Sequence, residues 1–303
     1  NILIFMSKSI SLLSALLCTL IWGTTFIAQE TGMKFIGPYV FNSVRFFVGF
    51  LAILPFVFLF ERGKITKTIS KDKTKFFCYS MLIGVFLFLG TVFQQVALIY
   101  TDVANAAFFT IFYVPMVPII VFFIFKKKIH SSVWLAALLC IIGGYLLTNF
   151  QNSTIRLGDS LVLIGALFWS LHIIYIGKII KIFDLPILIG VIQAFVVSIC
   201  SLILGIIFEE FILTNILQQK IQILYAGVLS GGVAFVLQIF AQKNISPAPS
   251  AIIFSLEGVF ATIAAWIILS QILNLNNIIG CVLILCGVII SQILPGYKKI
   301  SYR

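Results

Sequence analysis

The sequence predicts an all-α integral membrane protein with ten transmembrane helices, arranged as two inverted five-helix repeats. Its 303 residues are 61% hydrophobic and 10% charged, with a mean hydropathy of +1.19. These values lie far outside the range of soluble globular domains. Apolar stretches of about 20 residues, the length that crosses a bilayer, recur along the chain. Residue types also recur at a fixed offset between the two halves.

Ten apolar stretches are expected to span the membrane. They cover residues 9–28, 38–60, 76–99, 103–125, 133–150, 158–180, 186–208, 221–242, 249–271 and 277–295. Most connections are only a few residues long, as in antiparallel helical hairpins, and the charged segment 61–75 is the exception. A transmembrane β-barrel would instead show short alternating segments, and the sequence has none.

The first stretch is expected to be an uncleaved helix. Trp22-Gly23-Thr24-Thr25 does not resemble the small-residue cleavage site of a signal peptide. Met6-Ser7-Lys8 has the form of a natural start, which leaves open whether residues 1–5 belong to the natural protein.

The two repeats are expected to cover residues 8–150 and 158–296. At an offset of 144, Gln94 matches Gln238, Ala104 matches Ala248, Ala107 matches Ala251 and Gly143 matches Gly287. Near the first helix of each half, Leu20-Ile21-Trp22 is similar to Leu167-Phe168-Trp169. An odd number of helices in each unit makes the two units face opposite ways. Inverted repeats of this kind are typical of secondary transporters, with the substrate site between the halves.

The basic residues are distributed unevenly between the two ends of the expected helices. The net charge is +11, and sixteen of the twenty Lys and Arg residues lie on the side of the N-terminus. Only Lys34, Arg156 and Lys220 lie on the opposite side, and Arg45 lies inside a helix. Under the positive-inside rule both termini are therefore cytoplasmic. The basic excess favours the anionic headgroups of a lipid bilayer as its partner, and not nucleic acid.

No cofactor is expected from the motifs. The six cysteines are scattered inside expected helices without a CxxC pair or metal-ligand spacing, which favours small apolar packing residues. The sequence shows no P-loop, dinucleotide fingerprint or hydrolase elbow, and its two histidines do not form a catalytic set. The chain is expected not to be an enzyme or an ATP-driven pump.

Several motifs resemble those of the drug/metabolite transporter superfamily, EamA type. They are Ile21-Trp22-Gly23-Thr24-Thr25-Phe26, Val44-Arg45-Phe46, Ala97-Leu98 with Ala104-Asn105-Ala106-Ala107, and Ser255-Leu256-Glu257-Gly258-Val259-Phe260. In the last of these, Gly258 stands where the family usually has Pro. The resemblance covers roughly residues 10–295. It implies two EamA-type domains and solute transport by alternating access, but no particular substrate.

Two ionisable residues inside the expected helices are the first site candidates, because charges in lipid are costly and often functional. Glu257 lies about eight residues into its helix, or roughly 12 Å deep at 1.5 Å per residue. It is expected to bind substrate and exchange a proton, or else to be a neutral structural Glu. Arg45 shares a helix face with Asn42 and Gly49. It is expected to anchor a substrate carboxylate or phosphate, or else to snorkel to the membrane surface.

The other candidates are polar and aromatic residues at helical spacing. Trp22, Thr25 and Gln29 form one face of the first helix, and Trp169, His172 and Tyr175 form a similar face of the sixth. Gln94, Asn105 and Gln238 complete the set of expected substrate-binding residues. Each has a structural alternative, since aromatic stripes and buried amides commonly pack helices together. Pro115 and Pro118 predict an interruption in helix four, while Pro247 and Pro249 are expected to open helix nine.

The function expected from these features is secondary transport of a small metabolite, with an amino acid or a derivative favoured, across the bacterial inner membrane. The alternatives are a nucleotide-like or cofactor-like solute, and a non-transporting membrane scaffold or enzyme. A homodimer is compatible with the sequence. The direction of transport, the coupling ion and the substrate are not determined by it.

Overall fold

The computed structural model describes residues 2–70, 72–148, 155–270 and 272–300, and in these ranges it contains helices and no strands. Lys71 and Arg303, which entered the charge count, lie outside the described residues, as does position 150, where the first repeat is expected to end.

The first half contributes five membrane-spanning units. They are α1 (Ile2–Gly32), α2 (Pro38–Phe60), α4 (Lys73–Ala97), α5 (Val103–Thr110) with α6 (Tyr113–Phe123), and α7 (Ser131–Leu147). The second half repeats the order. Its units are α8 (Leu157–Phe183), α9 (Pro186–Phe208), α11 (Lys220–Leu224) with η2 (Tyr225–Ala234) and α12 (Phe235–Gln242), α13 (Pro247–Phe254) with α14 (Leu256–Leu269), and α15 (Leu275–Ile300).

These units confirm the predicted all-α membrane fold. Nine of them are long and apolar enough to cross a bilayer, and Ser131–Leu147 is a shorter apolar helix in the tenth place. Two short helices lie in connections: α3 (Arg62–Ile69) within the charged segment, and α10 (Leu213–Gln218) before the eighth span. The first helix is longer than expected and continues to Gly32.

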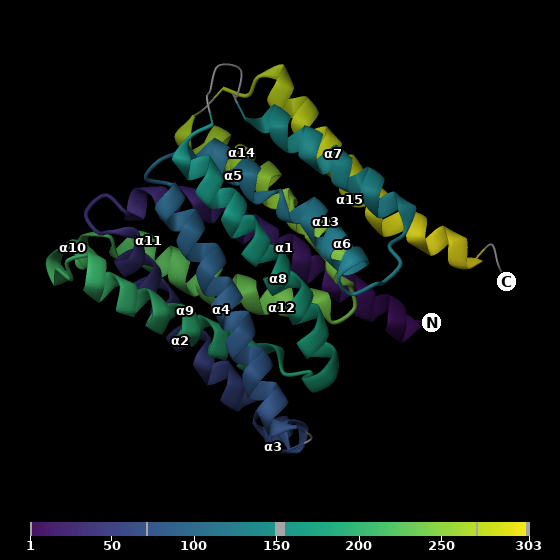
Figure 1. Cartoon of the computed structure of the whole chain (residues 1–303), viewed down its shortest axis with the longest axis horizontal. Helices are drawn as coiled ribbons and strands as arrows, with labels where there is room; N and C mark the ends of the chain where they lie inside the picture. Colours follow the sequence, from purple (N-terminus) through teal and green to yellow (C-terminus); the bar gives the residue numbers. More distant parts are fainter. Residues whose placement is uncertain (1, 71, 149–154, 271, 301–303) are drawn as a thin grey trace.

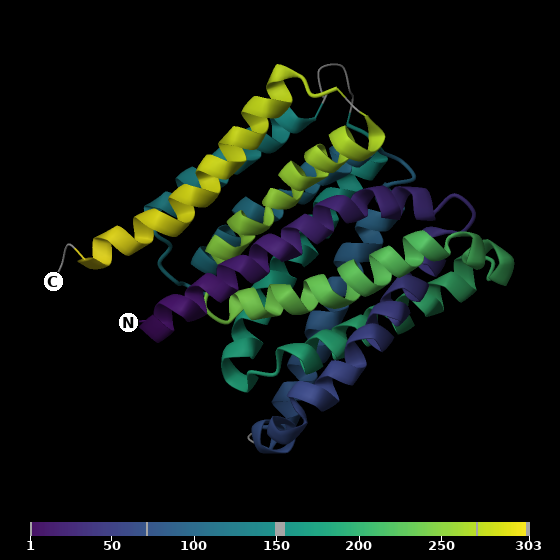
Figure 2. The same ribbon diagram turned by 180° about the vertical axis from the view of Figure 1, so that it is seen from behind.

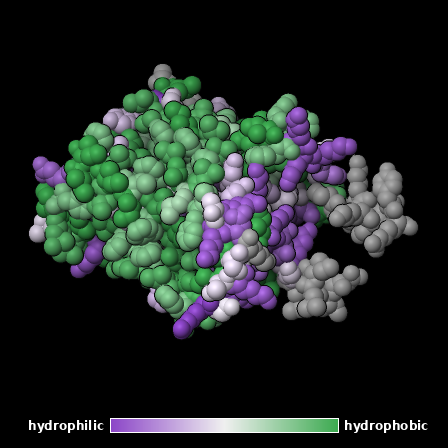
Figure 3. Space-filling view, turned by 60° about the horizontal axis from the view of Figure 1, so that its bottom comes forward, coloured by the Kyte–Doolittle hydropathy of each residue, from purple (hydrophilic) through white to green (hydrophobic). Residues whose placement is uncertain are grey.

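The helices pack as one bundle whose two chain ends lie on the same side, as an even number of spans requires (Figure 1, Figure 2). Asn244, just after α12, donates hydrogen bonds to Ser7 O and Ser11 Oγ of α1, which places the end of α12 beside the start of α1. We call this end of the bundle the terminal side and the opposite end the far side. Much of the surface is hydrophobic, with hydrophilic side chains gathered toward one end of the face in Figure 3. Such large apolar surfaces fit contact with lipid.

Helices four and nine are interrupted at equivalent places. The break between α5 and α6 falls at Ile111 and Phe112, and the break between α13 and α14 falls at Ser255. Pro115 has no N–H for the carbonyl of Ile111, which instead accepts from Val114 N at 2.8 Å. In helix nine, Pro247 and Pro249 open the helix as expected: they lie in the first turn of α13, where proline is tolerated, and the break lies further along. The carbonyl of Ser255 accepts from Gly258 N at 3.1 Å, which tightens this turn.

Helices α2 and α9 are antiparallel, and each caps the other. Glu61, directly after α2, accepts hydrogen bonds from Ile187 N and Leu188 N at 2.9 Å each, in the first turn of α9. Glu209, directly after α9, accepts from Tyr39 N at 2.9 Å and Val40 N at 2.7 Å in the first turn of α2. Both helices begin with proline. Carboxylates at helix N-termini satisfy free amides and complement the helix dipole.

The hydrogen bonds that the two capping carboxylates accept offset part of the cost of burying them. Burial raises the pKa of Glu61 and of Glu209, and the two amide hydrogen bonds that each accepts oppose this rise. The reciprocal caps therefore fasten α2 and α9 at both ends.

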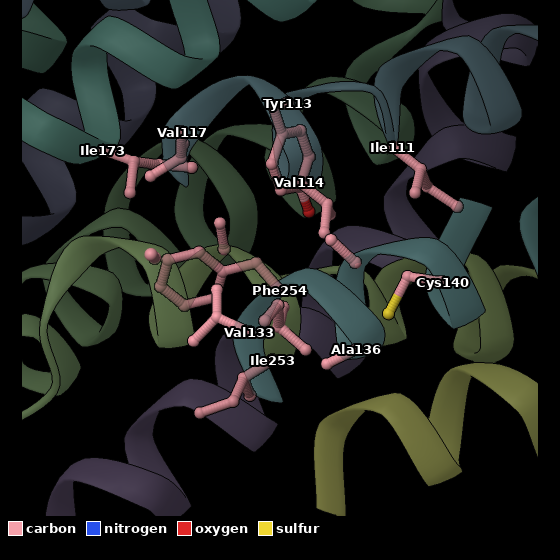
Figure 4. Packing of buried hydrophobic residues seen from close by; sticks show 14 of the residues in the cluster. Ile111, Tyr113, Val114, Val117, Val133, Ala136, Cys140, Ile173, Ile253 and Phe254 are labelled. Carbon is pink, nitrogen blue, oxygen red and sulfur yellow. The ribbon is translucent and has the colours of Figure 1, made fainter. Parts of the chain in front are cut away.

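The largest buried cluster lies where α6, α7, α8 and α13 meet (Figure 4). Tyr113, Val114 and Val117 of α6 pack there with Cys140 of α7 and Phe254 of α13. This cluster holds the broken helices together, so that the residues which follow the breaks have fixed positions.

Replacing either cap should destabilise the protein. Glu61→Ala and Glu209→Ala each leave two amides of the partner helix without an acceptor, and we expect each to cost about 1–2 kcal/mol of stability. The change would appear as a lower Tm of the purified protein in detergent.

Glu210→Ala is the matched control, because this neighbouring carboxylate is exposed. A Tm of Glu209→Ala equal to that of Glu210→Ala would contradict the capping role.

Candidate binding cavity

A cavity lies between the two repeats, near the middle of the bundle. Its lining residues are Trp22, Phe26, Gln29, Arg45, Thr91, Gln94, Thr110, Tyr113, Trp169, Ile173, Ser230, Phe235, Gln238 and Glu257. The volume is about 40 Å³. One water molecule needs on the order of 10–15 Å³, so the cavity has room for a few waters in this conformation.

A larger groove of about 490 Å³ lies between α2, α9 and α12. It is lined mainly by apolar side chains such as Ile53, Phe56 and Val236, and it contains none of the expected site residues. The smaller cavity is therefore the better candidate for recognition of a polar solute, since polar groups converge on it.

The central feature of the cavity is a contact between equivalent residues of the two repeats. Tyr113 Oη donates a hydrogen bond of 3.0 Å to Glu257 Oε1, and the two residues are 144 positions apart. Each lies within two residues of its helix break, and both are buried. Equivalent residues that touch each other must lie beside the pseudo-two-fold axis that relates the repeats. The pair therefore marks this axis at mid-depth.

Gly23 allows α1 to approach this pair closely. A Cβ atom at Gly23 would lie 2.6 Å from Glu257 O and 2.7 Å from Ala261 N. These are backbone atoms, which cannot turn away as a flexible side chain would. The neighbouring Trp22 reaches across the cavity, with ring centroids 6.3 Å from Trp169 and 5.2 Å from Phe235.

Arg45 enters the cavity from α2 with an unusual set of contacts. Its Nε donates to Asn42 Oδ1 at 2.8 Å, and its guanidinium lies over Phe41 and Phe46, with centroid distances of 5.5 and 4.9 Å. The residue is 3% exposed, so the guanidinium does not snorkel to the membrane surface. The ion pairs within the described residues are Arg156–Asp102 and Lys243–Asp184, neither of which includes Arg45. The two terminal NH₂ groups of this guanidinium, which form its fork, are thus available to bind an anionic group.

Two equivalent glutamines also line the cavity. Gln94 Nε2 donates to Thr110 Oγ1 at 3.0 Å, so this amide is fixed by the half of helix four that precedes the break. Both polar atoms of the buried Gln238 lack a protein partner in the described part of the chain. Buried polar atoms are normally hydrogen-bonded, so Gln238 retains capacity for a ligand or water.

The structure brings together six of the expected residues: Trp22, Arg45, Gln94, Trp169, Gln238 and Glu257. The other five lie behind the lining, namely Thr25, Asn42, Asn105, His172 and Tyr175.

Local contacts explain why four of these residues do not line the cavity. Thr25 bonds to the carbonyl of Ile21 in its own helix, and Asn42 is held by Arg45. His172 bonds to Gln193 at 3.0 Å, and the ring of Tyr175 packs on Tyr79 and Phe86. Asn105 is buried within α5, and its Nδ2 has no partner in the described part.

Sequence reasoning missed several lining residues, and three of them were recoverable. The offset of 144, applied to Glu257, identifies Tyr113. Phe26 and Ile173 lie one turn beyond the two tryptophans and were recoverable by helical spacing. Gln29, on the expected polar face of the first helix, does line the cavity. Thr91, Thr110, Ser230 and Phe235 carried no sequence signal that distinguishes them from packing residues.

Comparison with known proteins supports the family resemblance. The model of the EamA-like transporter family matches residues 9–149 and again 156–292. An uncharacterized transporter of Archaeoglobus fulgidus is 33% identical over 280 residues, which cover 91% of this chain and 84% of that protein. The uncharacterized transporter YoaV of Bacillus subtilis is 24% identical, covering 93% and 96%. A solved crystal structure with 15% identity superposes with a TM-score of 0.77 over 94% of this chain and 96% of that one, which shows a shared fold.

The close approach at Gly23 yields a stability prediction. Gly23→Ala introduces a methyl group 2.6 Å from a backbone oxygen, which forces α1 and α14 apart. We expect a loss of about 1–3 kcal/mol, measured as a lower Tm in detergent.

Gly63→Ala is the control, because a Cβ there meets nothing within 4 Å. That change should leave stability unaltered or raise it by about 0.5–1 kcal/mol, since Gly63 lies inside a helix. Equal effects of the two substitutions would refute the packing role of Gly23.

Proposed function

The chain belongs to the EamA-like transporter family, and from this premise we propose that it is a secondary active transporter of a small metabolite. The carrier would work by alternating access, with the cavity as its substrate site and repeats 8–150 and 158–296 as its two domains. It would reside in the bacterial inner membrane with both termini in the cytoplasm, as its basic residues favour.

The observation that carries the proposal is the placement of the cavity at two equivalent helix breaks. Irregular backbone inside a membrane is tolerated where it is buried in protein or lines a polar cavity. Transporter sites typically lie at the interface of inverted repeats beside discontinuous helices. Here Tyr113 and Glu257 follow the breaks at positions 111–112 and 255 and meet at that interface.

The groups in the cavity favour a zwitterionic solute such as an amino acid or a derivative. The free fork of Arg45 can bind one carboxylate through two parallel hydrogen bonds. Glu257 offers a carboxyl group for a substrate amine, and Trp22 and Trp169 provide apolar walls. The small volume implies that the walls move apart when substrate enters.

A nucleotide-like or cofactor-like solute is the second candidate, with phosphate on Arg45. The cavity has a single cationic side chain, which suits one carboxylate better than a run of phosphates. A membrane enzyme or scaffold is a weaker candidate, since neither needs a deep carboxyl group at the interface of inverted repeats.

Glu257 is proposed to couple transport to protons. It is 6% exposed, and its one hydrogen-bond donor in the described part is the hydroxyl of Tyr113. Carboxyl groups inside membrane spans commonly belong to proton relays, and water that enters the opened cavity would give Glu257 a partner for proton exchange.

The function is tested by uptake of a panel of radiolabelled amino acids into proteoliposomes, with an imposed pH gradient. Arg45→Lys keeps the charge but loses the fork, and we expect it to raise the KM of the transported solute about tenfold, equivalent to about 1.4 kcal/mol. Arg156→Lys, at an exposed ion pair, is the control and should leave KM unchanged. Absence of flux for every amino acid would overturn the favoured substrate class, and an unaltered KM in Arg45→Lys would remove Arg45 from the site.

Glu257→Gln tests proton coupling. An amide cannot exchange a proton, so we expect uptake by this variant to lose its dependence on the pH gradient while passive exchange of solute continues. Glu210→Gln, an exposed residue, should keep the native dependence. A native pH response in Glu257→Gln would show that another group couples transport.

A further inference from the structure

A group of buried polar residues extends from the cavity, which Gln238 lines, along α12 toward the terminal side. It consists of His172 on α8, Gln193 on α9, and Gln238 and Gln242 on α12, and we call it the inner cluster. All four residues are 0% exposed. His172 Nε2 and Gln193 Oε1 are 3.0 Å apart, and Gln242 Nε2 donates to the carbonyl of Ile173, next to His172. These contacts bring three helices together around one set of polar groups.

The inner cluster has more hydrogen-bonding capacity than the protein satisfies. His172 Nδ1, Gln193 Nε2, Gln242 Oε1 and both polar atoms of Gln238 lack a protein partner in the described part of the chain. A buried polar atom without a partner costs about 1–3 kcal/mol. So many of them at one place indicate a function beyond helix packing, because apolar residues would pack the same space without this cost.

An aromatic layer lies between the cavity and the imidazole of His172, whereas Gln238 itself lines the cavity. The ring of Phe235 stacks on Trp169 with a centroid distance of 5.9 Å and an interplanar angle of 4°. It also lies 5.2 Å from Trp22 and 6.0 Å from the imidazole of His172. Phe235 thus lines the cavity on one side and covers the inner cluster on the other.

The repeat relates the inner cluster to the wall of the cavity. At the offset of 144, Gln238 corresponds to Gln94 and Phe235 corresponds to Thr91. Both Gln94 and Thr91 line the cavity. The hydroxyl of Thr91 bonds to the carbonyls of Leu87 and Phe88, so this small side chain does not extend across the cavity as a phenyl ring would. At the equivalent position of the second repeat, the phenyl ring of Phe235 covers the imidazole of His172.

We propose that the inner cluster is a second subsite for the transported zwitterion, which Phe235 closes in this conformation. The inference rests on the proposed function and extends it to the terminal side. Movement of Phe235 off Trp169 would join the inner cluster to the cavity. Its amides and imidazole can donate to a carboxylate and accept from an amine, but they supply no fixed charge to hold either group. Substrate that leaves Arg45 and Glu257 would then be held only by the uncharged groups of the inner cluster, which bind it more weakly. Weak binding there would favour release, since conduction requires binding that is easily reversed.

Thiol accessibility tests whether Phe235 closes this space. The six native cysteines, at positions 18, 78, 140, 200, 281 and 286, are replaced by serine or alanine, and Gln193→Cys is introduced. The rate of its reaction with N-ethylmaleimide is then measured with and without Phe235→Thr, which copies the residue of the other repeat. We expect the second substitution to increase the rate at least about tenfold. Ser201→Cys, buried on the same helix two turns away, should show no increase.

Phe235→Leu provides a second variant in case Phe235→Thr does not fold, and it should increase the rate as well. An equal rate in the native and Phe235-substituted backgrounds would overturn the inference, even where amino acid uptake is measured. A parallel rise at position 201 would also overturn it, because it would indicate general loosening. A raised rate at position 193 alone, without uptake of any amino acid, would instead overturn the favoured substrate class, while the closure of the inner cluster by Phe235 would stand.

Uptake assays test whether the space serves substrate. Gln193→Leu, with the native cysteines present, should lower the maximal rate several-fold with little change in KM at the far side. Gln219→Leu is the matched control, because it makes the same change at a buried residue of a connection outside the bundle centre. Equal maximal rates in the two variants would exclude substrate from the inner cluster.

Discussion

The fold of this protein depends on one constraint: inside a bilayer, every backbone amide and carbonyl must find its hydrogen-bond partner within the protein. The caps of α2 and α9 meet this constraint at helix ends, where four amides would otherwise be free. Because each helix supplies the carboxylate for the other, the two can move only as a unit. The breaks at positions 111–112 and 255 meet the same constraint differently, since they lie in the packed centre beside the cavity. Helices that are paired by caps, around a centre that contains two helix breaks, fit the proposed mechanism of alternating access.

The two repeats share a backbone plan but differ in the chemistry of equivalent positions. Arg45 and Thr91 on the far side correspond to Gln193 and Phe235 on the terminal side, at offsets of 148 and 144. Stacking of Phe235 on Trp169 favours closure of the terminal side, and an aromatic pair contributes about 0.5–1.5 kcal/mol beyond its buried area. Sequence divergence between the repeats can thus bias the equilibrium between two conformations that symmetry alone would make nearly equal in free energy.

Hydrophobic patterning predicted the ten spans, because a bilayer imposes length and composition on each helix separately. It did not predict the role of Glu61 or Glu209, because a carboxylate at a helix end looks like any interfacial charge until its partner helix is known. Prolines predicted the break in helix four but not the one in helix nine, which depends on a turn at Ser255. Thr25 and His172 were placed on the cavity by helical spacing alone, which defines a face but not how far the neighbouring helix covers it. Tertiary packing decides these details.

The pseudo-two-fold axis assigns different roles to the two deep charges. Under alternating access, the repeats exchange conformations, so a residue beside the axis keeps the same surroundings while the side from which water reaches it changes. Glu257, in contact with its own repeat equivalent Tyr113, has this position. Arg45 lies off the axis, and its equivalent in the second repeat is the neutral Gln193. The guanidinium on the far side of the cavity therefore has no charged counterpart at the equivalent position on the terminal side. Proton exchange needs access from both sides, and selective capture needs a charge on one side. Symmetry therefore suits Glu257 to coupling and Arg45 to recognition.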